Sequence, residues 1–151
     1  MTNDEKLKLI ALDLTKSYPR SPRATIGGYV IAARCVDKAR ADLAGTIGEY
    51  HSGCPLDKIF LEFAGLTIEG LREVLATGAS DDEVGAWIQK NAQQKEKIEV
   101  IKWNNSWRDK ELSELPDYLQ EYMEEYVPQF VPKNRPVYRF FDVYDLEEQR
   151  I

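Results

Sequence analysis

The amino-acid sequence predicts an all-α fold, a single compact domain of about six helices with an extended C-terminal tail packed on it. Apolar residues recur three and four positions apart along most of the chain, which is the spacing of one helix face. Proline, glycine and serine fall at the ends of these segments, whereas the alternating pattern of a strand is almost absent. The 151 residues suffice for one domain whose core needs no stabilising disulfide.

The domain predicted over residues 1–151 has three parts. Residues 1–20 are expected to form an N-terminal arm, in which the apolar stretch 7–14 is extended or helical. Residues 21–127 are expected to form the helical body. Residues 128–151 are expected to form the tail. This division follows the places where the helical spacing of apolar residues begins and ends.

The first helix of the body is predicted over residues 29–43. Apolar residues occupy one face of this segment, and we expect its charged residues to lie on a solvated face: Arg34, Asp37, Lys38, Arg40 and Asp42. Pro55 suits the first position of a second helix that runs to about Ala64, and Gly65 suits the position just after its end.

Local capping signals predict the remaining helices. Thr67 is placed to cap a helix that ends at Gly78. The run from Ser80 to Glu83 matches a capping box, in which each side chain accepts a backbone N–H of the other residue. The spacing of apolar residues then predicts helices over about 95–112 and 116–126.

The tail is predicted to be extended because Pro128, Pro132 and Pro136 restrict the backbone. Residues 138–144 are aromatic and partly alternate, which is compatible with one short strand. A lone strand has no sheet to join, so we expect the tail to pack on the helices instead.

Composition and charge exclude several classes of protein. The chain has 26 acidic and 20 basic residues, and this net charge of −6 argues against general nucleic-acid binding. No segment approaches the roughly 20 apolar residues of a membrane-spanning helix, and the N-terminus lacks the pattern of a secretory signal. Two cysteines are too few for a disulfide scaffold, so we expect a cytoplasmic protein with reduced thiols.

A basic stretch suggests a site for a small anionic ligand, one that bears phosphate or carboxylate. Residues 16–40 contain six basic residues and one acidic residue. Arginine offers paired N–H donors, and glycines before a helix leave backbone N–H groups free for an anion. The candidate residues are Arg20, Ser21, Arg23, Gly27, Gly28 and Arg34. The alternative is that these charges form local ion pairs on a solvated surface.

The loop before Pro55 offers a different chemistry. Cys54 precedes a predicted helix, whose N-terminal dipole favours a thiolate, so this residue is a candidate nucleophile. His51 is then the candidate base and Glu49 the residue that orients it. His51 and Cys54 could instead share a metal, but a single such pair is too few for a structural zinc site, so we expect no metal and no cofactor. The alternative is a small buried cysteine and an ordinary loop histidine.

The aromatic residues of the second half are expected to form mostly core. Some of them could form an interface, because aromatic side chains are enriched at such surfaces. A homodimer through the C-terminal region is therefore a second expectation about partners. These aromatic residues are Trp87, Trp103, Trp107, Tyr118, Tyr122, Tyr126, Phe130, Phe140 and Phe141.

A string of short motifs resembles a family of small bacterial proteins catalogued as domain of unknown function 5069. The resemblance covers about residues 13–92. The motifs are Ser21-Pro22-Arg23, Gly27-Gly28-Tyr29, Asp37-Lys38-Ala39-Arg40-Ala41, Ala44-Gly45-Thr46, Gly48-Glu49-Tyr50 and Cys54-Pro55-Leu56-Asp57. The resemblance implies a helical, bacterial, cytoplasmic protein and transfers no catalytic residue. The sequence therefore favours a protein that binds a partner or a small anion, with a thiol- or metal-dependent enzyme as the alternative.

Overall fold

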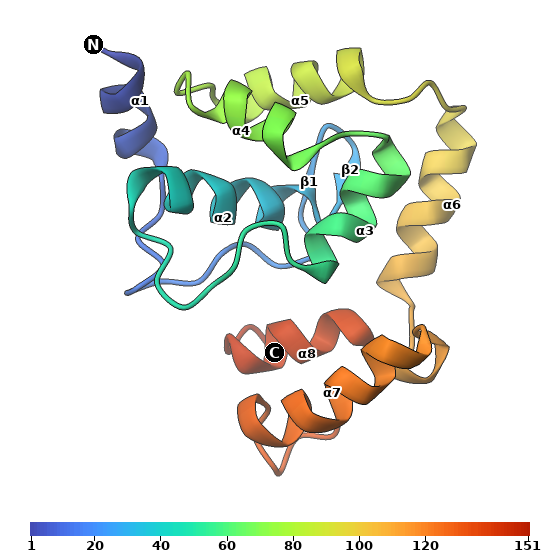
Figure 1. Cartoon of the computed structure of the whole chain (residues 1–151). Coiled ribbons are helices and arrows are strands. Elements are labelled where there is room, and N and C mark those ends of the chain that lie inside the picture. The colour runs from blue at the N-terminus through green and yellow to red at the C-terminus, as the bar shows by residue number, and fades with distance from the viewer. The chain divides into compact units, whose positions relative to one another are not determined.

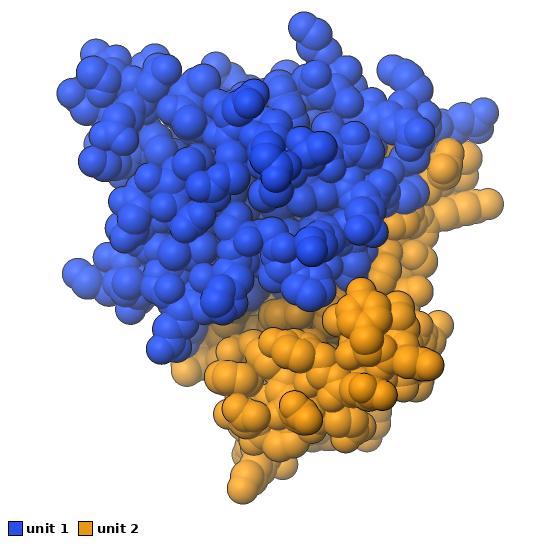
Figure 2. All heavy atoms as spheres, viewed as in Figure 1, with its two compact units in different colours: residues 1–96 blue, residues 97–151 orange.

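The computed structural model describes all 151 residues and is mostly helical. It contains eight α-helices, one 3-10 turn and a single two-stranded sheet, so the predicted number of about six helices was too low. The chain divides into two compact units, unit 1 over residues 1–96 and unit 2 over residues 97–151 (Figure 2). The prediction of one domain stays a prediction. None of the helices is long and apolar enough to cross a membrane.

The elements follow one another as labelled in Figure 1. Unit 1 contains α1 (Asn3–Ile10), β1 (Thr25–Ile26), β2 (Tyr29–Val30), α2 (Ala32–Ala44), α3 (Pro55–Ala64), α4 (Ile68–Leu75) and α5 (Asp81–Asn91). Unit 2 contains α6 (Lys97–Arg108), the 3-10 turn η1 (Leu112–Glu114), α7 (Asp117–Phe130) and α8 (Phe140–Glu147).

Helix α2 is the central element of unit 1. It packs against α1, α3 and α4, and every residue from Ala32 to Ala41 is buried. The expectation of a solvated charged face on this helix was therefore wrong for Arg34, Asp37, Lys38 and Arg40. Burial of Asp37, Lys38 and Arg40 is tolerated because each meets an opposite charge from another part of unit 1.

A short hairpin precedes α2, where the sequence predicted that the helix had already begun. Strands β1 and β2 pair antiparallel, with Ile26 opposite Tyr29. The two residues between them, Gly27 and Gly28, both have positive φ, as a tight two-residue hairpin turn requires. Ile31 separates the hairpin from α2. Its φ of 73° is not helical, so the helix begins only after this residue.

The capping signals were read correctly. The Ser80 hydroxyl accepts the backbone N–H of Glu83, and the Glu83 carboxylate accepts the N–H of Ser80, which confirms the capping box of α5. The Thr67 hydroxyl caps α4 by accepting the N–H of Gly70. Pro55 opens α3, and Gly65 ends it in the left-handed conformation.

Unit 2 corrects the prediction of an extended tail over 128–151. Helix α7 continues through Pro128 to Phe130, and residues 140–147 form α8, so only the connection between these helices is extended. Proline fits near the end of α7 because few helical hydrogen bonds remain to be lost there. Helix α8 places Phe140 and Tyr144 one turn apart with ring centroids 5.6 Å from each other, a contact that a strand would not give.

Candidate functional site

Helix α2 carries two separate polar clusters. Residues Asp37 and Arg40 belong to the first, which we call the arginine network and which also contains Arg20 and Asp81. Residues Cys35 and Lys38 belong to the second, which we call the thiol cluster and which also contains Cys54 and Asp57 from α3. In both clusters the α2 residues are three positions apart, so they lie on one face of the helix.

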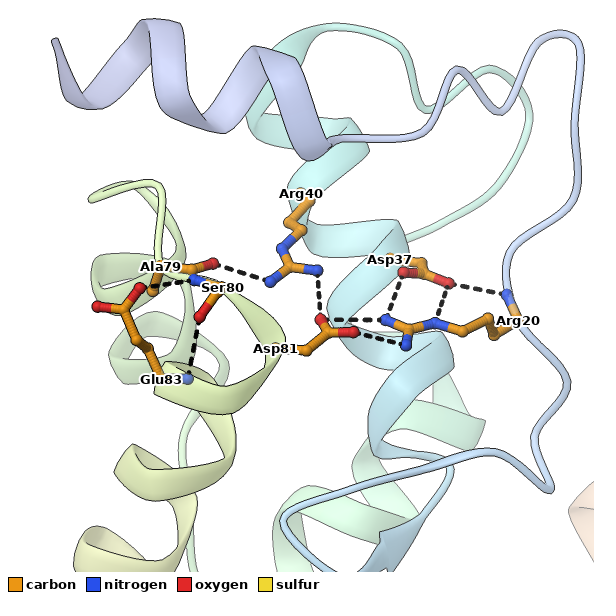
Figure 3. A network of polar contacts seen from close by, with 7 residues as sticks. All are labelled: Arg20, Asp37, Arg40, Ala79, Ser80, Asp81 and Glu83. Atoms are coloured by element: carbon orange, nitrogen blue, oxygen red, sulfur yellow. Dashed lines mark hydrogen bonds and ion pairs between the residues drawn. The ribbon is translucent and has the colours of Figure 1, made fainter. Parts of the chain in front are cut away.

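The arginine network joins α2 to the segment before the hairpin and to the start of α5 (Figure 3). Arg20 donates from Nε and Nη2 to the two carboxylate oxygens of Asp37, over 3.0 and 2.9 Å. Its Nη1 donates to Asp81 over 2.8 Å. Arg40 donates to the other oxygen of Asp81 over 2.7 Å and to the carbonyl of Ala79 over 2.9 Å. Two arginines thus share two aspartates, and the charges balance.

The charges of this network stabilise the contact between α2, the start of α5 and the segment before the hairpin. Burial raises the pKa of Asp81, but hydrogen bonds and attraction from Arg20 and Arg40 outweigh burial and hold this pKa below its usual value. Burial lowers the pKa of Arg20, whereas Asp37 and Asp81 raise it by more. The ionised forms of all these groups therefore stabilise one another.

Several of the residues predicted to bind an anion have contacts within unit 1. The Ser21 hydroxyl accepts the N–H of Arg23 over 3.1 Å. Arg34 donates to the carbonyl of Arg20 over 3.2 Å.

Gly27 and Gly28, also predicted to bind an anion, form the hairpin turn against α5. Gln89 donates to the Gly27 carbonyl, and a Cβ atom at Gly27 would lie 3.0 Å from Ile88. The sequence analysis missed Asp37 and Asp81 as partners of Arg20, and Arg40 as the second arginine that binds Asp81. The available signal was the spacing of Asp37 and Arg40, which places both on one face of α2.

The thiol cluster is centred on the ammonium group of Lys38, whose side chain is only 4% exposed. Its Nζ lies 3.0 Å from Oδ1 of Asp57, a fully buried carboxylate, and donates to Sγ of Cys54 over 3.0 Å. The second carboxylate oxygen of Asp57 accepts the N–H of Gly53 over 2.9 Å. Asp57 therefore fixes both the ammonium group and the loop that carries the thiol.

The two cysteines of this cluster differ in environment. Cys54 is partly exposed and is the N-cap residue of α3, so its sulfur lies at the positive end of the helix dipole. Cys35 is fully buried, and burial together with Asp57 raises the pKa of its thiol well above the usual value. Burial lowers the pKa of Lys38, but Asp57 and Cys54 outweigh burial and raise it. Of the two cysteines only Cys54 is partly exposed, and its sulfur lies beside a fixed ammonium group.

The other residues predicted for this loop lie outside the cluster. Glu49 and His51 are exposed, and the hydrogen bond to Cys54 comes from Lys38 and not from His51. No group of three or more His, Cys, Asp or Glu residues is placed to hold a metal ion. Lys38 and Asp57 were missed as partners of Cys54, because the contact joins two helices and is not apparent from neighbouring residues.

These features define a mostly helical protein with a buried lysine beside a partly exposed cysteine. The chain belongs to the family described as domain of unknown function (DUF5069), whose model matches residues 16–150. The resemblance seen over about 13–92 therefore extends through almost all of unit 2. The curated proteins contain no match to this chain.

Proposed function

We propose that this protein acts through a nucleophilic thiol, that of Cys54, beside which Asp57 holds the ammonium group of Lys38. The observation that carries the proposal is the distance of 3.0 Å between Lys38 Nζ and Cys54 Sγ, within a cluster that Asp57 holds in place. The thiolate is the reactive form of cysteine, and a nearby positive charge stabilises it.

The helix dipole and the lysine act on the same sulfur. Cys54 stands at the start of α3, where the dipole favours negative charge within the first turn. Lys38 adds a full charge that is almost entirely shielded from water, where electrostatic attraction is stronger than at the surface. Because Asp57 fixes the ammonium group, it needs no rearrangement when the sulfur becomes charged.

The substrate class is a small electrophile that can reach the loop before α3. The sulfur supplies the electron pair of the new bond, and the leaving group of the electrophile departs with the pair of the bond that breaks. The ammonium group of Lys38 stabilises negative charge on the sulfur and is not a base, so the thiol proton leaves to water and neither His51 nor Glu49 is needed.

Anion binding by the basic stretch has less support from the geometry. The guanidinium groups of Arg20 and Arg40 already contact carboxylates within unit 1. A small anionic ligand there would have to compete with Asp37 and Asp81. The hypothesis predicts that phosphate compounds raise the melting temperature and that Arg23→Ala abolishes this shift.

The thiol proposal is tested by the rate at which iodoacetamide alkylates each cysteine of the whole protein at neutral pH, followed by peptide mass spectrometry. Cys54 should react at least about tenfold faster than free cysteine. Cys35 is the internal control and should stay unmodified while the protein is folded. In urea both cysteines should react at similar rates. A folded-state rate for Cys54 no higher than that of free cysteine would refute the proposal.

A further inference from the structure

Unit 2 contains a groove that the thiol chemistry does not use. Its cavity has a volume of about 410 Å³ and is formed by η1, α7 and the extended connection that follows α7. Met123 and Val127 contribute apolar surface, while Glu111 and Glu124 contribute carboxylates. A cavity of this size accommodates one large side chain or a small ligand.

The residues that line this groove include two acidic residues and no basic residue. Helix α7 carries Asp117, Glu121, Glu124 and Glu125 and no basic residue. Two more acidic residues, Glu111 and Glu114, lie at the neighbouring 3-10 turn. None of these six carboxylates forms an ion pair within the structure. Two of them, Glu111 and Glu124, line the cavity, and this acidic lining favours a positively charged occupant.

An exposed aromatic side chain accompanies these carboxylates. Tyr138 lines the cavity and is 72% exposed. Aromatic faces attract guanidinium and ammonium groups, and tyrosine is enriched at the centres of protein interfaces. Apolar surface, aromatic faces and carboxylates together match a segment that combines basic and aliphatic side chains.

We propose that this groove binds a basic segment of a partner protein, with an arginine or lysine side chain beside a residue such as leucine. Charge argues against a second copy of the chain at the same place. A symmetric dimer through this surface would bring the carboxylates of one copy against those of the other. This inference is independent of the thiol proposal, because it uses only residues of unit 2.

The test is fluorescence anisotropy of a labelled ten-residue peptide of alternating arginine and leucine, titrated with the full-length protein. The peptide should bind, and its affinity should fall as ionic strength rises. The double variant Glu111→Gln with Glu124→Gln should bind about tenfold more weakly, and Tyr138→Ala several-fold more weakly. A peptide with glutamate in place of arginine should not bind.

The matched control is the double variant Glu62→Gln with Glu73→Gln, which removes the same charge from exposed positions of unit 1. This control should bind the peptide like the wild type. If it weakens binding as much as the groove variant, attraction is non-specific and the proposal is wrong. The proposal is equally wrong if sedimentation shows a dimer that Tyr138→Ala dissociates, since the groove would then hold a second copy.

Discussion

Two faces of α2 carry polar clusters that differ in chemical capacity. In the arginine network Arg20 donates through Nε and both Nη groups to carboxylates, and Arg40 donates through its Nη groups to a carboxylate and a carbonyl, whereas Nε of Arg40 has no partner. In the thiol cluster Lys38 has only one carboxylate partner and directs another N–H at a sulfur atom. The first arrangement pairs each charge with an opposite charge and holds segments together. In the second arrangement the ammonium group also contacts a sulfur atom that can react.

The difference shows why a basic stretch in a sequence is a poor indicator of ligand binding. Arg20 and Arg40 are close to many other basic residues along the chain, yet distant aspartates neutralise both of them. No neighbouring residue in the sequence marks Lys38 as unusual. Its contacts to Cys54 and Asp57 form only because α2 packs against α3. The comparison gives several expectations, which follow from the largest effect to the smallest.

The largest effect is expected in the thiol cluster, from Asp57→Asn. This change leaves the buried ammonium group of Lys38 without its counter-charge and should lower the free energy of unfolding by about 3–5 kcal/mol. Urea denaturation measures the loss. The double variant Lys38→Met with Asp57→Asn removes both charges and should recover most of the stability. If the double variant is no more stable than Asp57→Asn, the two residues are not coupled as described.

Gly27→Ala should give the next largest effect. This variant tests whether the hairpin turn packs closely against α5. Gly27 has a φ of +62°, and an added Cβ would lie 3.0 Å from Ile88. We expect a loss of about 2–3 kcal/mol. Gly45→Ala is the control, since Gly45 also has positive φ but faces open space. That variant should lose only about 1 kcal/mol, and equal losses would contradict the packing role.

Asp37→Asn should weaken the arginine network less than Asp57→Asn weakens the thiol cluster. The side chain of Arg20 is 36% exposed, so water can replace part of the lost interaction. Thermal and urea unfolding should show a loss of about 1–2 kcal/mol. A loss as large as that of Asp57→Asn would mean that the two clusters are equally dependent on burial.

The smallest expected effects are on the pH dependence of the free energy of unfolding, and they differ between the two clusters. The pKa of Asp81 is lowered in the folded protein, so its contribution is present above the unfolded pKa and is lost as pH falls below about 4. Its exposure limits this contribution to less than about 1 kcal/mol. The pKa of Cys35 is raised, so stability should fall as pH rises above about 8.5, where the unfolded thiol ionises.

Variants assign these two limbs of the pH profile. Asp81→Asn should flatten the acid limb of a plot of unfolding free energy against pH and leave the alkaline limb unchanged. Cys35→Ala should do the opposite. The interpretation fails if either variant changes both limbs equally.

Local signals in the sequence were sufficient for several boundaries of the fold. The capping box at Ser80 and the proline at the start of α3 depend on residues within one turn, so sequence alone reveals them. Helix α8 was missed because its aromatic residues also alternate like those of a strand, and ring packing within unit 2 decides between the two. The hairpin was missed because Gly27 and Gly28 were interpreted as glycines that free backbone N–H groups before a helix, although two glycines between short strand-forming segments are typical of a hairpin turn.

The candidate site was predictable only in part. Cys54 stands out in the sequence because Pro55 marks a helix start directly after it. Its partners do not stand out, because Lys38 precedes it by 16 residues on another helix. The spacing of Cys35 with Lys38, and of Cys54 with Asp57, is the one sequence signal that both pairs share, and only the packing of α2 on α3 shows that they meet.

The most direct test of the central claim is the alkylation rate of Cys54 in the double variant Lys38→Met with Asp57→Asn, compared with Lys58→Met. Lys58 is an exposed lysine of the same helix as Cys54 and takes no part in the cluster. If Lys38 activates the thiol, the double variant should react with iodoacetamide at least about tenfold more slowly than the wild type, while Lys58→Met keeps the wild-type rate. Equal rates in all three folded proteins would contradict the claim.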